Sequence, residues 1–183
     1  RDDLTTFIPN FVQNCENKLY RTLHLRNEET ALSVSISSGV AAVPSNFKAL
    51  KFAYVSRTPV CLLQWVPLEE LYRDYPNRSY SEYPSVISRE GANFVFGPVS
   101  VDGTLNGVYY AKKDPLRTTD PSWYVTNAPD VLLYGSLLES APFIQNDQRL
   151  QVWAELYKDA VQTLKDEEKD SAVSKGQLVQ RVS

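Results

Sequence analysis

The sequence predicts an α+β protein with a helical bundle core, made of N-terminal, middle and C-terminal helices, and a β-rich insertion of short antiparallel strands. Two observations predict this fold class. Apolar residues recur at helical spacing near both ends of the chain, and residues 28–112 alternate apolar and polar side chains as strands do. A chain of 183 residues can bury roughly 70% of its unfolded surface without disulfides. We therefore expect a single domain over residues 1–170 and a C-terminal arm over residues 171–183.

The N-terminal helix is expected over about residues 5–26. Its start is placed near Thr5 or Thr6, because Pro9 is tolerated only in the first turn of a helix. The apolar residues on one face then follow the helical period: Ile8, Phe11, Val12, Cys15, Leu19 and Leu23. This face is expected to meet a core.

The β-rich insertion is expected over about residues 28–112, with about six short strands. The first strand is the clearest, because Leu32, Val34 and Ile36 line one face between serines. The further strand candidates are residues 40–43, 48–56, 60–66, 86–88, 94–96 and 105–112. Asp102-Gly103 is a hairpin signal. A two-turn helix is expected between strands, with Pro67 at its start.

Two more helices are expected over about residues 128–141 and 146–168. Asn127 is a favourable N-cap after a strand-like segment that begins at Trp123, and Pro129 is tolerated in a first turn. The last helix would be roughly 33 Å long. Its apolar stripe is formed by Leu150, Trp153, Leu156, Tyr157, Ala160, Val161 and Leu164.

The sequence contains no residue pattern typical of an enzyme or of a metal or cofactor site. The motifs GxSxG, GxxxxGK[ST], GxGxxG and HExxH are absent. His24 is the single histidine, and Cys15 and Cys61 form no CxxC pair, so we expect two buried free thiols. We therefore predict no catalytic residues, no cofactor and no metal.

Charge and hydropathy restrict the partners further. The net charge is −3 and the isoelectric point is about 5.3, which argues against a protein that grips nucleic acid through a broad basic face. No apolar run approaches the ~20 residues needed to span a bilayer, so we expect no membrane contact. The chain does not begin with Met, and we expect residues to precede Arg1.

Residues 75–85 are the most irregular part of the sequence. Three tyrosines with two prolines predict a loop that either presents aromatic rings to a partner or packs on its own domain. The candidate contact residues are Tyr75, Arg78, Tyr80 and Tyr83. The arm over residues 171–183 has too few apolar residues to fold alone, so it is either loose or ordered by a partner.

Four separated segments together resemble the head-to-tail adaptor (connector) proteins of tailed bacteriophages. Three of them cover residues 3–23, 43–47 and 108–112, the last ending a strand in paired tyrosines. The fourth runs from Trp123 to Trp153. It contains Asn127-Ala128-Pro129-Asp130, Tyr134-Gly135, Glu139-Ser140-Ala141 and Asp147-Gln148-Arg149. Each segment is weakly specific alone, but their order is specific, and they span nearly the whole chain. The loop at 75–85 and the tail past residue 170 match no part of the family pattern.

The resemblance implies a structural virion protein at the head-to-tail interface, assembled in the cytoplasm of the bacterial host. In such proteins twelve copies form a ring beneath the portal protein, extend the DNA channel and offer an attachment surface to tail or nozzle proteins. DNA is expected to pass without sequence-specific binding, which the low isoelectric point permits. The C-terminal arm becomes a candidate for portal docking through Lys175, Leu178, Val179, Arg181 and Val182.

A second hypothesis comes from the residues alone. A carbohydrate- or peptide-binding β module would present Tyr75, Tyr80 and Tyr83 to its ligand. An adaptor is expected to form a ring of defined copy number with portal, whereas a ligand-binding module should stay small and bind its ligand saturably.

Overall fold

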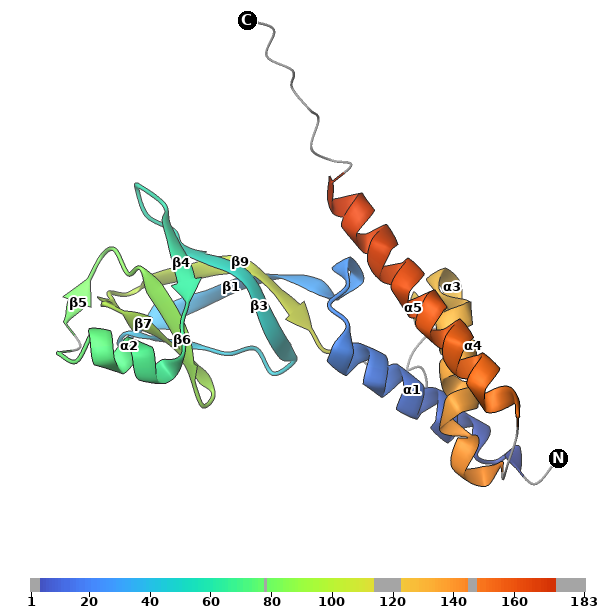
Figure 1. The fold of residues 1–183 in the computed structure, drawn as a ribbon. Coiled ribbons are helices and arrows are strands. Elements are labelled where there is room, and N and C mark those ends of the chain that lie inside the picture. The colour runs from blue at the N-terminus through green and yellow to red at the C-terminus, as the bar shows by residue number, and fades with distance from the viewer. Residues whose placement is uncertain (1–3, 78, 114–122, 145–147, 174–183) are drawn as a thin grey trace, which may run out of the picture. The chain divides into compact units, whose positions relative to one another are not determined.

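The computed structural model describes residues 4–77, 79–113, 123–144 and 148–173 (Figure 1). The chain divides into two compact units. One is Glu28–Lys113, and the other combines Arg1–Asn27 with Asp114–Ser183. The first unit is called the barrel unit below, and the second is called the helical unit.

The barrel unit is a closed barrel of seven strands in the order β1-β2-β7-β6-β4-β3-β9. All neighbouring strands are antiparallel except β4 and β6, which run parallel. The strands are β1 (Glu29–Ser37), β2 (Val40–Ala42), β3 (Phe47–Val55), β4 (Cys61–Trp65), β6 (Val86–Glu90), β7 (Asn93–Gly97) and β9 (Gly103–Ala111). The short helix η2 (Arg26–Glu28) precedes β1, and α2 (Leu68–Asp74) connects β4 to a two-stranded sheet of β5 (Tyr80–Ser81) and β8 (Val99–Ser100).

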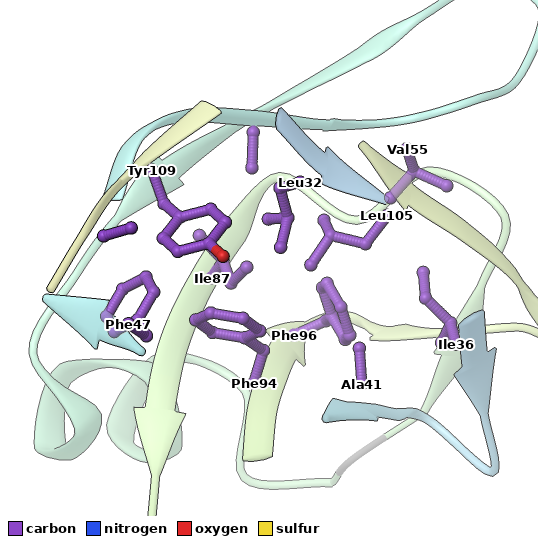
Figure 2. Close-up of a cluster of buried hydrophobic side chains, with 12 residues drawn as sticks. Leu32, Ile36, Ala41, Phe47, Val55, Ile87, Phe94, Phe96, Leu105 and Tyr109 are labelled. Carbon is purple, nitrogen blue, oxygen red and sulfur yellow. The ribbon is translucent and has the colours of Figure 1, made fainter. Parts of the chain in front are cut away.

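Side chains fill the interior of the barrel, so it is a packed core and not a channel (Figure 2). Phe47 lies edge-on to Phe94, with ring centroids 5.3 Å apart, and stacks on Tyr109 at 5.7 Å. The core residues, from six of the seven barrel strands, are Leu32, Ile36, Ala41, Phe47, Ala53, Val55, Ile87, Phe94, Phe96, Leu105, Tyr109 and Ala111. This burial is what the period-two pattern of the sequence predicts for one face of each strand.

A bulge interrupts β3 where it pairs with β9. The pairing of β3 with β9 shifts register between Leu50 and Phe52. Opposite this bulge is Gly107, where a Cβ atom would lie 2.2 Å from the Phe52 carbonyl oxygen. Only glycine permits this approach of the two backbones, and bulges of this kind bend and twist a strand.

The helical unit contains α1 (Ile8–Thr22), α3 (Trp123–Asn127), α4 (Pro129–Glu139), η3 (Ala141–Phe143) and α5 (Arg149–Val173). At Gly135 on α4, an added Cβ atom would lie 2.2 Å from the Cys15 sulfur and 2.9 Å from the Tyr157 ring. Helices α1, α4 and α5 therefore come together at Gly135, where α4 has no side chain. Their shared core includes Cys15, Leu19, Leu23, Leu25, Tyr124, Ala128, Val131, Leu132, Ala160 and Leu164.

The predicted fold class was wrong. The core was predicted to be a helical bundle, with residues 28–112 as an insertion of short strands. Those strands instead close on themselves as a seven-stranded barrel with its own interior core. The physical reason is that the first and last long strands pair along most of their lengths, from Glu29 with Tyr110 to Ile36 with Gly103. That pairing joins the first strand of the barrel to the last and buries their apolar face inside it.

Two local predictions also differ from the structure. Asn127 does not cap the middle helix: it ends α3, and its side-chain amide donates to the Trp123 carbonyl at 3.0 Å, so the segment expected to be a strand is helical. Asp102-Gly103 does not form a hairpin turn, because the preceding strand β8 pairs with β5. The Asp102 carboxylate instead accepts a hydrogen bond from the Ser38 N–H at 2.9 Å.

Candidate assembly surfaces

Polar groups in the interior of the two units serve the fold. Glu28 is fully buried, and its carboxylate pairs with the Lys48 ammonium at 2.6 Å. Glu16 is also buried and accepts a hydrogen bond from the Tyr20 hydroxyl at 3.4 Å. Across the part of the chain that the structure describes, no group of three or more His, Cys, Asp or Glu side chains is placed to hold a metal ion. These two buried carboxylates therefore have partners within the fold.

The Cys15 thiol is not suited to nucleophilic chemistry. Burial, together with the nearby Glu139 carboxylate, raises its pKa to about 11. A thiol with such a pKa is almost entirely protonated at neutral pH, whereas the thiolate is the reactive form. Cys15 therefore acts as a small apolar side chain between α1 and α4.

Two of the predicted contact tyrosines are exposed on the barrel unit. Tyr80, on β5, is 62% exposed, and Tyr83 is 49% exposed. The Tyr83 hydroxyl donates to the Thr58 carbonyl at 3.5 Å, which brings the tyrosine loop close to the connection between β3 and β4. Both rings are available to a partner.

Tyr75 lies elsewhere in this loop and has a structural contact. Its ring covers Gly97, where an added Cβ atom would lie 2.5 Å from the ring. Its hydroxyl is 3.0 Å from the Ser85 hydroxyl, within hydrogen-bonding distance. Arg78 lies outside the described residues, as do Lys175, Leu178, Val179, Arg181 and Val182 of the predicted arm.

The start of β4 and the connection before it add exposed apolar side chains that were not predicted. Leu62 is 71% exposed and Val60 is 59% exposed. Both belong to the apolar run at 60–63, which is typical of a strand buried on both faces. The sequence therefore gave no signal that one face of this strand is exposed to solvent.

The helical unit has an apolar groove between α1 and α4 with a volume of about 520 Å³. Leu133 on its wall is 55% exposed, and Ile8 at its end is 52% exposed. The lining residues are Ile8, Phe11, Val12, Val125, Pro129, Leu132, Leu133, Ser136, Leu137 and Ser140. The available signal was that α4 carries apolar residues on nearly every side, which a helix packed on one face does not need.

The described residues therefore form a scaffold with exposed apolar surfaces, and none of the described helices is both long and apolar enough to cross a bilayer. A family model described as SU10 adaptor protein matches residues 1–181. A search of curated proteins found no match. The family match covers both units and all four segments on which the resemblance to head-to-tail adaptors rests, and it confirms that resemblance.

Proposed function

The chain belongs to the SU10 adaptor protein family, and we propose that it forms a ring beneath the portal of a tailed phage and joins the head to the tail. As a member of this family it is a structural phage adaptor, which associates with portal and tail proteins. The single observation that carries the proposal is a family match over nearly the entire chain. The ring, for which the resemblance implies twelve copies, would extend the DNA channel.

The character of the surfaces supports a role in assembly. Each unit exposes large apolar side chains, such as Leu62 on the barrel unit and Leu133 on the helical unit. Exposed apolar surface of this kind is common where proteins meet one another. The net charge of −3 suits a wall that DNA passes without being held. We propose that the chain works through geometry and has no catalytic role.

Two assignments of contact residues remain part of the proposal. The arm that follows α5 would dock into portal through Lys175, Leu178, Val179, Arg181 and Val182. Tyr80 and Tyr83, with Arg78, would contact a tail protein or a neighbouring copy. Tyr75 has a smaller part in this contact, because its ring is held over Gly97.

The rival hypothesis of a carbohydrate- or peptide-binding module receives less support. It requires the three tyrosines to present their rings together, whereas Tyr75 packs on its own unit while Tyr80 and Tyr83 are exposed. We therefore assign the exposed tyrosines to protein contacts within the virion.

The test is to mix the purified chain with purified portal and to count subunits around the axis by electron microscopy. We expect rings of defined copy number, close to twelve, on portal. A chain that stays monomeric and does not bind portal would contradict the proposed function.

The arm is tested separately by deleting residues 174–183, because α5 ends at Val173 and would remain complete. We expect the shortened chain to fold and to lose portal binding. A full-length variant with Leu178, Val179 and Val182 changed to Asp should behave in the same way. A matched variant with Gln177 and Gln180 changed to Asp should still bind. Portal binding by the shortened chain would refute the arm assignment.

A further inference from the structure

The barrel unit has an unpaired backbone edge at Leu62 on β4. The Gln64 N–H donates to the Ser85 carbonyl at 2.9 Å, so the backbone groups of Gln64 face β6. Backbone groups alternate sides along a strand, and those of Leu62 therefore point in the same direction as those of Gln64. Pairing between β4 and β6 covers only Gln64 with Val86 and Trp65 with Ile87. Within the described chain, no backbone group pairs with Leu62 on this side.

The register explains why β6 does not cover this edge. If the parallel pairing continued by two residues, Leu62 would lie opposite Pro84. In a parallel ladder the donor to the Leu62 carbonyl would then be the Ser85 N–H, but that N–H donates to the Gly97 carbonyl at 3.0 Å, so the ladder does not continue. In Figure 1 the connection between β3 and β4 extends beyond the rest of the barrel.

A second unpaired edge lies at Tyr80 on β5. The Ser79 and Ser81 carbonyls accept hydrogen bonds from the Val99 and Val101 N–H groups, at 3.0 Å and 3.2 Å. The backbone groups of Tyr80, which lies between these serines, therefore point away from β8. No other described strand pairs with β5.

The two edges share a feature that distinguishes them from the rest of the surface. Leu62, at 71%, and Tyr80, at 62%, are the two most exposed large hydrophobic side chains in the described chain. Each edge thus offers one N–H, one C=O and one large apolar side chain. An antiparallel hydrogen-bonded pair needs one N–H and one C=O from each strand, because its two residues exchange both N–H···O bonds. Apolar side chains that lie opposite each other add to the stability of such a pair.

We propose that the Leu62 edge of one copy pairs antiparallel with the Tyr80 edge of the next copy in the ring. This inference rests on the proposed function, since it names the contact that joins the copies. The contact is heterologous, because one surface of each copy meets a different surface of its neighbour. Repetition of such a contact generates a ring when the rotation between copies closes. The same pairing covers both exposed side chains and satisfies the backbone groups of both short edges.

The test uses cysteine cross-linking of the full chain, assembled on portal, with Cys61 first replaced by Ser because it adjoins Leu62. In the paired edges the Cα atoms of positions 62 and 80 would be about 5.5 Å apart. That separation is within the range of about 4.4–6.8 Å that disulfides span. Leu62→Cys and Tyr80→Cys are made singly and together, and the products are separated under non-reducing conditions.

We expect the double variant to give a ladder of covalent oligomers up to the complete ring. An equimolar mixture of the two single variants should give dimers, and each single variant alone should stay uncross-linked. Dimers from Leu62→Cys alone would indicate a symmetric contact and would overturn the proposal. Uncross-linked rings of the double variant would also overturn it, while leaving the proposed function intact. Failure to form rings on portal would instead contradict the proposed function, and this inference with it.

A second experiment removes the hydrogen bond without adding a reactive group. Leu62→Pro deletes an N–H that points away from β3, so the β3–β4 pairing should persist. We expect this variant to stay folded by circular dichroism and to lose at least tenfold in ring assembly. Phe52→Lys, at another exposed apolar position on the barrel, is the control and should assemble normally. Unchanged ring assembly by Leu62→Pro would refute the pairing.

Discussion

The barrel unit and the helical unit bury their apolar residues in different ways. The barrel closes a sheet around Phe47, Phe94 and Tyr109, and the apolar residues that it exposes lie on its outer surface and at its edges. The helical unit packs α4 against α1 and α5, yet leaves an open apolar groove along α1 and α4. Closure lets the barrel enclose its interior side chains, whereas the helical unit leaves an apolar groove open between two of its helices.

The largest expected effect tests whether the barrel is an independent core. Phe94→Ala removes a fully buried ring, and such changes cost about 3–5 kcal/mol. We expect the barrel to unfold at markedly lower urea concentration, followed by Trp65 fluorescence in a background with Trp123 and Trp153 replaced by Phe. The unfolding of the helical unit, followed by Trp153 fluorescence in the complementary background, should not move. Equal shifts of both transitions would show that the two units do not have separate cores.

A smaller effect is expected on the pH dependence of stability, which should differ between the two units. The pKa of the Cys15 thiol, raised to about 11 by burial, lies above its ordinary value of 9.0. The folded state therefore holds this proton more tightly, and the stabilisation is complete below about pH 9 and lost as the pH rises toward 11. As the pH rises from below 9 to about 11, we expect the free energy of unfolding of the helical unit to fall by about 2 kcal/mol more in the wild type than in Cys15→Ala.

The barrel transition serves as the internal reference for this measurement, because Cys15 lies in the helical unit. Burial also raises the pKa of Tyr157, but that residue is present in both proteins and its contribution largely cancels. Identical pH profiles of the wild type and Cys15→Ala would contradict the assignment of a buried, protonated thiol.

The smallest effect on stability is expected at the groove. Leu133→Glu changes a side chain that is 55% exposed, so the free energy of unfolding should change by no more than about 0.5 kcal/mol. Binding of an apolar fluorescent dye should nevertheless fall, because a charge then enters the groove. The matched variant Phe52→Glu, on the outside of the barrel, should leave dye binding unchanged. Equal losses in both variants would mean that the dye does not report on the groove.

The sequence predicted the local elements well and the closure of the sheet poorly. Helical periodicity placed α1, α4 and α5, and Pro67 marked the start of the short helix α2. Period two placed most strands within a few residues. Closure depends on pairings that no local pattern contains, such as Glu29 with Tyr110 and the parallel pairing of Gln64 with Val86. Asn127 was wrongly predicted to be an N-cap, because a residue type that caps a helix can also end the helix before it.

The candidate surfaces were predicted only in part. Aromatic residues between prolines identified the exposed Tyr80 and Tyr83, but the same pattern could not separate them from Tyr75, whose position depends on Gly97 across the fold. The edge at Leu62 was missed because its exposure depends on where the neighbouring strand stops. That stop depends on Ser85, whose N–H donates to the Gly97 carbonyl on β7 and not to β4.

The order of the units along the chain has a consequence for synthesis on the ribosome. The barrel is complete once β9 has been synthesised. In contrast, α1 can pack only after α4 has been synthesised, because its Lys18 pairs with Glu139, 121 residues later. Domains generally fold as units while translation continues. The nascent chain therefore carries a finished barrel behind a first helix whose Phe11, Cys15 and Leu19 are still uncovered. During that interval, protection of the newborn protein from aggregation depends on the speed of elongation and on chaperones.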